Sequence, residues 1–313
     1  MEHLLDRRVL FFGGKGGVGK TTCAAATALE AARRGRSVLL VSVDPAHSVS
    51  DVFAMPVGDG PTAIVPGLTA RELDPAAEVD RYLATVKSQV SALFSPSVVK
   101  QAFRQFDLAT QSPGLEDVAV FDRIVQLVLE PSAGHDLLIV DTAPTGHALR
   151  MLAMPEVLSD WLDALARRRR DIVAEQDRAA DDAATDPVVV SLTQRRARVQ
   201  AFHQRLTSTD ATGFALVLTP ERLPIEETKR AADALDRLGV GVPAVIVNRV
   251  LPTTADGDFL AARARQQAIY LREIEARFGA YRRIAVPQFE ADVYGLDALE
   301  RVRAELFRAG STT

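Results

Sequence analysis

The stretch VLFFGGKGGVGKTT, residues 9–22, decides the fold class of this chain. Its first four residues form an apolar run that predicts a buried strand, and the residues from Gly14 to Thr21 satisfy the pattern G-x-x-x-x-G-K-[ST]. In such a loop, glycines allow backbone N–H groups to surround phosphates, and a lysine and a hydroxyl group open the following helix. The order of strand, glycine loop and helix therefore predicts a P-loop domain that binds a nucleotide.

The residues of this loop have separate expected roles. Lys20 is placed to reach the β- and γ-phosphates, and the Thr21 hydroxyl is placed to bind Mg²⁺. Lys15 follows the first glycine of the pattern and is not needed to hold a nucleotide in its own subunit, so it is a candidate for charge stabilisation across a dimer interface. The nucleotide-binding residues expected in the segment are Gly14, Lys15, Gly16, Gly17, Val18, Gly19, Lys20, Thr21 and Thr22.

Composition limits the kinds of partner. The 313 residues are 47% hydrophobic and carry a formal net charge of −4, which gives no support to nucleic-acid binding. The single cysteine, Cys23, disfavours a thiolate zinc or iron–sulfur site within one chain. No apolar stretch reaches the length of about 18 residues that a membrane span needs, and the N-terminus lacks a signal-peptide core. We expect a cytoplasmic protein that is not an integral membrane protein.

Along the rest of the chain, short apolar runs alternate with helical patterns, which is typical of βα units and a mainly parallel sheet. Strands are predicted at residues 9–12, 37–43, 68–73, 137–140, 214–218, 245–247 and 284–286, the third as a short edge strand. Helices are predicted at residues 20–34, 225–238, 260–278 and 296–307. The pattern predicts one α/β P-loop domain over residues 1–313, its sheet flanked by helices.

Two regions interrupt this alternation and have apolar residues at helical spacing, at about residues 76–112 and 155–207. We expect them to form a helical subdomain inserted into the α/β domain. The polar stretch 171–186 inside the second region predicts a mobile or disordered loop. The pattern leaves open whether the apolar positions of residues 79–106 line a groove or form only a core.

Three polar residues follow or end predicted strands, where open α/β sheets place their sites. Asp44 is expected to orient or deprotonate the water that attacks the γ-phosphate, the alternative being a helix cap. Asp141 is expected to hold Mg²⁺ through a water molecule. Asn248 has an amide that can pair with the edge of adenine, and its alternative is a plain turn residue at the end of a strand.

Two segments beside these aspartates are expected to respond to the loss of the γ-phosphate. The first follows Asp44 and contains the expected switch residues Pro45 and His47, although a histidine here can also serve a local hydrogen bond. The second follows Asp141, where a proline and a glycine permit the loop to shift. The switch residues expected there are Thr145, Gly146 and His147.

Together, these motifs resemble the ArsA/GET ATPases, a family that includes arsenite-pump ATPases and the cytosolic targeting factor for tail-anchored membrane proteins. The resemblance rests on the loop with Lys15, on DPAH at residues 44–47 and on DTAPTGH at residues 141–147. It continues through TPERLPIEETK at residues 219–229 and VNR at residues 247–249, so it covers most of the chain. With one loop and no C-x-x-C zinc motif, the chain is similar to the bacterial-type, single-domain form.

The resemblance implies a Mg²⁺-dependent ATP hydrolase that acts as a homodimer, in which Lys15 of one subunit reaches the phosphates of the other subunit's nucleotide. It also implies that the helical subdomain holds a hydrophobic client helix. The residues to which it assigns roles are Lys15, Lys20 and Asp44 in catalysis, Thr21 and Asp141 for Mg²⁺, and Glu221, Asn248 and Pro287 around the nucleoside.

Departures from the family leave the biological role open. Four methionines are few for a groove that accepts varied clients, and one cysteine is too few for the metalloid sites of arsenite pumps. The chain is therefore either a targeting factor for tail-anchored membrane proteins or an energising or regulatory ATPase subunit for an anion or metalloid transporter.

Overall fold

The computed structural model describes residues 2–44, 48–93, 99–100, 103, 114–130, 134–142, 152–153, 159, 162–171, 186–252 and 257–308. The chain forms two compact units. The first consists of Met1–Leu73, Pro131–Leu149 and Leu206–Thr313, and the second consists of Asp74–Glu130 and Arg150–Arg205.

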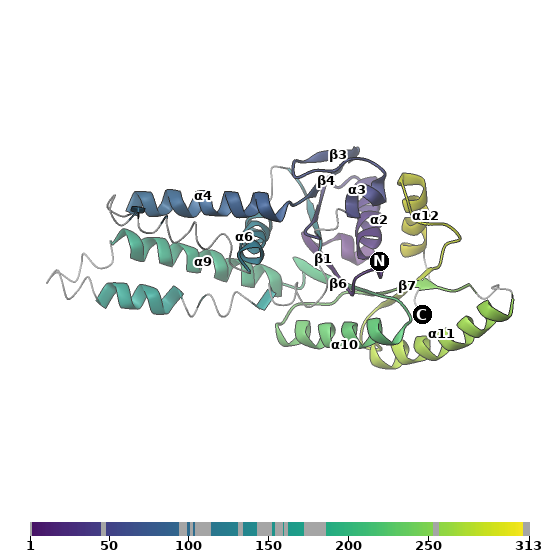
Figure 1. The fold of residues 1–313 in the computed structure, drawn as a ribbon. Helices are drawn as coiled ribbons and strands as arrows, with labels where there is room; N and C mark the ends of the chain where they lie inside the picture. Colours follow the sequence, from purple (N-terminus) through teal and green to yellow (C-terminus); the bar gives the residue numbers. More distant parts are fainter. Residues whose placement is uncertain are drawn as a thin grey trace. The chain divides into compact units, whose positions relative to one another are not determined.

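An eight-stranded sheet is the centre of the first unit (Figure 1). Its strand order is β3-β4-β2-β5-β1-β6-β7-β8, and every neighbouring pair is parallel except β3 and β4. The strands are β1 (Val9–Gly13), β2 (Val38–Ser42), β3 (Thr62–Val65), β4 (Leu68–Glu72), β5 (Leu137–Asp141), β6 (Thr212–Leu218), β7 (Val245–Val250) and β8 (Arg283–Pro287). The predicted mainly parallel sheet is therefore confirmed.

One edge of the sheet differs from the prediction. The strand expected at the edge, residues 68–73, is β4, which lies one place further in. The edge position is taken by β3, which pairs antiparallel with β4. Pro61 and Pro66 flank β3, and prolines so close together argue against a strand unless it lies at an edge. The turn between the two strands uses Gly67 at φ +84°.

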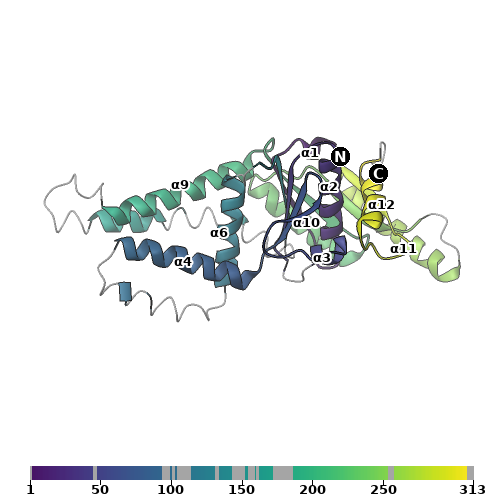
Figure 2. The ribbon, with the colours of Figure 1, turned by 90° about the horizontal axis from the view of Figure 1, so that it is seen from above.

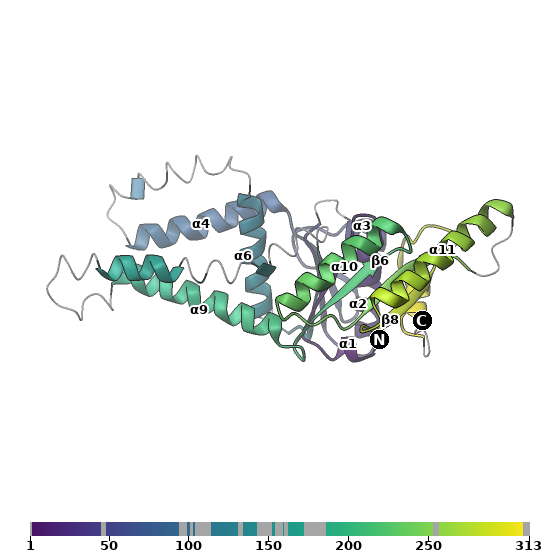
Figure 3. The ribbon, with the colours of Figure 1, turned by 90° about the horizontal axis from the view of Figure 1, so that it is seen from below.

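Helices cover both faces of this sheet. On one face lie α2 (Lys20–Arg33), α3 (Ser48–Phe53) and α12 (Leu296–Leu306) (Figures 1 and 2). On the other face lie α10 (Arg222–Arg237) and α11 (Asp258–Arg277), which Figure 3 shows in front of the sheet. A short helix, α1 (Glu2–Leu5), precedes β1. The four predicted helices are confirmed, with ends that differ by a few residues.

Small side chains allow α2 to lie close to the sheet. Ala24, Ala25 and Ala28 are fully buried, and alanine also has the highest intrinsic preference for helix. The central strands β1, β2, β5 and β6 are buried along their whole length, as expected for parallel strands covered on both faces. Close packing fixes the first turn of α2 relative to the carboxyl ends of these strands.

The second unit is helical in the part that the structure describes. Its long helices are α4 (Pro75–Leu93), α6 (Leu115–Leu129) and α9 (Pro187–Thr207), and α6 crosses the other two (Figures 2 and 3). Phe121 of α6 meets Phe202 of α9 edge to face, with ring centroids 5.5 Å apart. Helix α6 lies between the two predicted helical regions. Residues 172–185, most of the stretch predicted to be mobile, fall outside the described residues.

No helix among the described residues has both the length and the hydropathy needed to cross a membrane.

A buried carboxylate at the end of β4 anchors the start of α3. The Oε1 atom of Glu72 accepts hydrogen bonds from the backbone N–H groups of Val49 and Ser50, at 2.7 and 3.0 Å. Its Oε2 atom accepts a third from the Ser50 hydroxyl at 2.9 Å. A negative charge at a helix N-terminus is also favourable because it faces the positive end of the helix dipole. Glu72 therefore fixes the position of the first turn of α3, the helix that follows Asp44 in the sequence.

We predict that Glu72→Ala lowers the free energy of unfolding by about 2–4 kcal/mol, because three hydrogen-bond donors, one of them buried, lose a charged acceptor. Urea denaturation of wild type and variant measures this difference. Glu72→Gln, which keeps one acceptor oxygen, should lie between them. The control is Glu275→Ala on the exposed side of α11, which we expect to change stability by no more than about 0.5 kcal/mol. Equal midpoints for the Glu72→Ala protein and wild type would contradict the anchoring role.

Candidate functional site

The glycine loop between β1 and α2 has no room for side chains at two of its positions. A Cβ atom on Gly14 would lie 2.2 Å from the Val217 carbonyl oxygen of β6. A Cβ atom on Gly19 would lie 2.3 Å from the side-chain nitrogen of Asn248, and the φ of Gly19, +93°, disfavours other residues in any case. The loop is therefore held against the ends of β6 and β7, with its N–H groups at the start of α2, a position that favours anions.

The two lysines of the loop have different surroundings. Lys20 is buried, with 5% of its surface exposed, and its Nζ atom donates to the Lys15 carbonyl oxygen at 3.5 Å. The ammonium group of Lys15 is half-exposed and lies 3.5 Å from the Oε1 atom of Glu227 on α10. Lys20 therefore belongs to the interior of the loop, whereas Lys15 extends to its outside.

Thr21 and Asp141 come together at the head of α2. The Thr21 hydroxyl donates to Asp141 Oδ2 at 2.6 Å, and the Ser42 hydroxyl approaches the same oxygen at 3.5 Å. The other carboxylate oxygen, Oδ1, is buried and has no hydrogen-bond partner among the described residues. A threonine hydroxyl beside an unpartnered carboxylate oxygen is the kind of oxygen donor set that Mg²⁺ prefers, so these residues fit the expected metal.

Burial raises the pKa of Asp141 to about 6. The Thr21 hydrogen bond and the charge of Lys20 act in the opposite direction, whereas the charge of Asp44 raises the pKa further. The two carboxylates therefore repel each other. A cation placed between the loop and these strands would relieve this repulsion.

Asp44 lies just after β2 and is half-buried. Its backbone N–H donates to the Ser42 hydroxyl at 3.2 Å, so one serine approaches both aspartates. In the parallel pairing of β2 with β5, Ser42 stands directly beside Asp141. The expected switch residues Pro45, His47, Thr145, Gly146 and His147 lie outside the described residues, so their roles stay predictions.

Asn248 and Pro287 lie in one cavity beside the loop. The cavity has a volume of about 410 Å³, and Gly19, Thr22, Arg249 and Phe289 also line it. This volume lies within the usual range of ligand sites, about 300–1,000 Å³.

The Asn248 side chain is already engaged with the protein. Its Nδ2 atom donates to the Val18 carbonyl oxygen at 2.8 Å, and its Oδ1 atom accepts from the Arg249 N–H at 2.9 Å. The residue therefore braces the glycine loop, and pairing with adenine stays a prediction.

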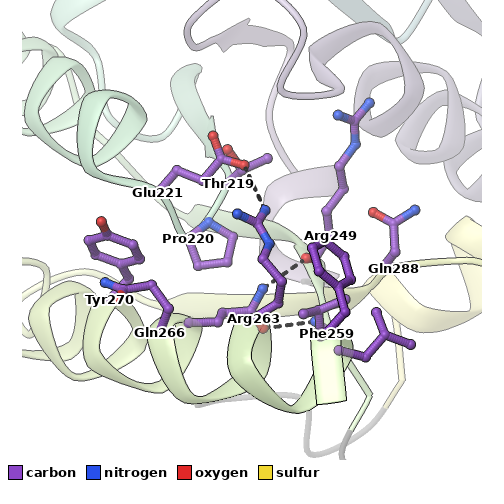
Figure 4. A pocket seen from close by; sticks show the side chains of 12 residues that line it. Thr219, Pro220, Glu221, Arg249, Phe259, Arg263, Gln266, Tyr270 and Gln288 are labelled. Atoms are coloured by element: carbon purple, nitrogen blue, oxygen red, sulfur yellow. Dashed lines mark hydrogen bonds and ion pairs between the residues drawn. The ribbon is translucent and has the colours of Figure 1, made fainter. Parts of the chain in front are cut away.

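Glu221 lies apart from the cavity of Asn248 and Pro287. It lines a cavity of about 310 Å³ together with Lys15 and Gly16. It also lines one of about 420 Å³, where Glu221 and Arg263 of α11 approach within 4.0 Å (Figure 4). The structure thus groups Glu221 with the outer side of the loop, where Lys15 lies.

Three residues near the loop received no role from the sequence. Ser42 ends a buried apolar strand, and a hydroxyl group at the end of such a strand could have identified it as a candidate site residue. Glu227 has no signal, because only the fold brings α10 beside Lys15. Arg249 stands in the VNR motif, next to a predicted site residue, but its backbone conformation is visible only in the structure.

Comparison with known proteins agrees with this geometry. The family described as Anion-transporting ATPase matches residues 7–308. The chain is 36% identical over 297 residues to an arsenical pump-driving ATPase of Aquifex aeolicus (strain VF5), covering 94% of this chain and 97% of that protein. It is 31% identical over 313 residues to the ATPase get3 of Schizosaccharomyces japonicus, covering 96% of this chain and 94% of the relative.

A longer relative also matches. The arsenical pump-driving ATPase of Halobacterium salinarum is 31% identical over 312 residues, which are 98% of this chain and 45% of that protein. The glycine loop, the aspartates at the strand ends and these matches lead to one conclusion: the chain belongs to the ArsA/GET family of anion-transporting ATPases, and its reaction is the hydrolysis of ATP.

Proposed function

We propose that this ATPase requires Mg²⁺ and acts as a homodimer, in which ATP is hydrolysed between two subunits and the nucleotide state moves a helical subdomain. The observation that carries the proposal is the different placement of the two loop lysines. Lys20 is buried within the loop, whereas the ammonium group of Lys15 lies outside it, beside α10. A lysine outside its own loop is available to the nucleotide of a second chain.

Thr21 and Asp141 would hold the metal ion. Asp141 Oδ2 is oriented by the Thr21 hydroxyl, which leaves the buried Oδ1 for the ion or its water. When bound, Mg²⁺ supplies positive charge to the oxygens of the β- and γ-phosphates. Protein groups then have only to position the reacting atoms and to balance the remaining charge.

Asp44 would orient the water for in-line attack on the γ-phosphate. Charge then develops on the oxygens of the transferred phosphoryl group, where it meets Lys20 and Lys15 of the partner subunit. A cation supplied in trans is worth a factor of about 10³–10⁵ in rate where an arginine does this. We expect a similar or smaller factor for a lysine.

Lys15 leaves its resting partner at little cost. Lys15 and Glu227 are each 34% exposed in their side chains. Ion pairs this open to solvent stabilise a protein by no more than about 1 kcal/mol. Exchange of Glu227 for a phosphate of the other subunit would therefore cost little free energy.

For the output of the cycle, we propose that the second unit binds a hydrophobic helix of a membrane-protein client in the cytoplasm. Helix α4 supports this, because Val86 and Val90 are only half-buried although they lie on the side of the buried Leu83. Co-purification of membrane-protein tails, lost in a Val86→Ser, Val90→Ser double variant, tests the proposal. Leu83 is unsuitable for this test because its substitution would disturb the core.

The alternative is an ATPase subunit that drives an anion or metalloid transporter. The family description and the names of the Aquifex and Halobacterium relatives favour it. Stimulation of ATP hydrolysis by an oxyanion, a metalloid or a transporter subunit, in the absence of any effect of hydrophobic peptides, would favour this role over client binding.

We predict that Lys15→Ala retains nucleotide affinity within about twofold but loses most of its turnover, by up to about 10³-fold, because only the transition state needs the cation in trans. Fluorescent-nucleotide titration and steady-state ATP hydrolysis measure the two quantities. Lys229→Ala is the matched control, since Lys229 lies on the same helix as Glu227 and pairs with Asp233. A wild-type kcat in the Lys15→Ala protein would remove the proposed role.

We predict that Asp44→Asn traps an ATP-bound dimer, because nucleotide still binds but the water is not oriented. Light scattering with ATP and Mg²⁺ should give twice the mass of the chain, and ADP should return it to the mass without ATP. If the variant keeps the mass of one chain with ATP, the dimer proposal fails.

We predict that Asp141→Asn stabilises the metal-free protein at neutral pH. The pKa of this carboxyl is about 6 in the folded chain against an ordinary 3.8, so the folded state binds the proton more tightly. Wild-type stability therefore falls as pH rises from about 4 to about 6, by up to about 3 kcal/mol. The variant lacks this loss.

Urea denaturation across this pH range, with and without Mg²⁺ and ADP, measures the effect. Added Mg²⁺ should stabilise the ADP complex of the wild type and not that of the variant. Parallel pH profiles for the two proteins would contradict the assignment of this carboxylate.

A further inference from the structure

Arg249 has a backbone conformation that is rare for a residue with a side chain. Its φ is +58°, and the only other non-glycine residue with positive φ in the described part of the chain is Ala54. The left-handed region brings Cβ close to the following carbonyl oxygen and so strains any residue except glycine. Pairing of β7 with β8 also changes register between Val247 and Val250. Strain of this kind persists where the surroundings hold it, and it concentrates at functional sites.

The surroundings hold this strain through the backbone. The N–H of Arg249 donates to Asn248 Oδ1 at 2.9 Å, and its carbonyl oxygen accepts from Gln267 Nε2 at 3.4 Å. The Gln267 Oε1 atom accepts from the N–H of Leu251 at 2.8 Å. None of these contacts uses the arginine side chain. A glycine would satisfy them with less strain, so the side chain needs another explanation.

The guanidinium group has no hydrogen bond or ion pair with the described residues. Nearby Arg263 differs, because it pairs with Glu221, and in Figure 4 the Arg249 side chain extends away from that pair. Arg249 lines the cavity of Asn248 and the cavity beside Lys15. Its side chain thus lies next to the glycine loop.

Arg249 lies close to the first turn of α2, because it lines one cavity together with Gly19 and Thr22. This region already contains the buried Lys20 and the positive end of the helix. One more cation beside these groups is unfavourable unless a ligand with electron-rich or negative groups covers it.

The cavity offers some apolar surface on which a planar base can pack. Pro287, Phe289 and Val293 supply this surface, beside the polar residues Asn248, Gln288 and Asp292. A guanidinium group is planar and weakly hydrated, so it stacks on aromatic faces.

We propose that Arg249 is a base-binding residue of the ATP site, whose guanidinium group stacks on the nucleobase in the cavity formed with Asn248 and Pro287. The proposal rests on nucleotide binding at the glycine loop and needs neither a dimer nor hydrolysis. It also gives a role to an arginine at a position where glycine would be less strained, since strained residues concentrate at binding sites.

The test compares ADP with pyrophosphate in calorimetric titrations without metal ions. Arg249→Gly should raise the Kd for ADP about tenfold, because the base loses its stacking partner, and should leave the Kd for pyrophosphate within about twofold. The urea midpoint should stay equal or rise, because the glycine relieves strain. Arg249→Lys keeps the charge and loses the plane, so it should weaken ADP binding in the same way.

Two controls separate the proposal from general effects. Ala54→Gly relieves the same kind of strain away from the cavity, and Arg263→Ala removes a nearby arginine charge; both should bind ADP like the wild type. Equal losses for ADP and pyrophosphate, unchanged ADP binding, or a lower urea midpoint in the Arg249→Gly protein would each overturn the proposal. A wild type that binds neither ligand would overturn the nucleotide site itself, whereas a failure of the Lys15 prediction would leave this test unaffected.

Discussion

The hydrogen bond from Thr21 to Asp141 is the constraint on which the arrangement of the site depends. It joins the first turn of α2 to the end of β5 over 2.6 Å. Because β5 pairs with both β1 and β2, fixing α2 on β5 also sets the distance between the loop after β1 and Asp44 after β2. Burial of this carboxylate is unfavourable, as its raised pKa indicates. A buried carboxylate with a raised pKa at the head of a phosphate loop is a candidate site for a cation.

Much of the fold was predictable because it depends on local patterns. Buried parallel strands are continuous apolar runs. The runs at residues 137–140 and 214–218 have the length of such strands and are too short for a helix. The edge strand of the sheet, β3, could not be predicted from a local pattern in this way. Prolines on both sides of β3 disfavour the prediction of a strand there. Its pairing with β4 depends on a turn at Gly67. Helix α6 was not predicted from the sequence. Its apolar residues pack on α4 and α9, and this packing exists only in the assembled unit.

Site residues also divide into those that a local sequence pattern predicts and those that only the tertiary structure reveals. Lys20, Thr21 and Asp141 were predictable because one motif or one strand end identifies each of them. Ser42 becomes part of the site only through the register that sets it beside Asp141. Arg249 becomes notable only through its φ, which no residue type encodes. Sequence therefore predicts the groups suited to phosphate and metal, whereas the residues that orient these groups depend on tertiary structure.

The anchor at Glu72 also has a mechanical consequence. This carboxylate binds the first N–H groups of α3, and Glu72 is the last residue of β4, while α4 begins at Pro75. The connecting chain spans about 10 Å at most when fully extended. This short connection permits little movement of β4 relative to the start of α4. A displacement of α3 would therefore reach the start of α4 through the hydrogen bonds of Glu72 and the short chain that follows it, so the stiffness of this connection depends on a single buried glutamate.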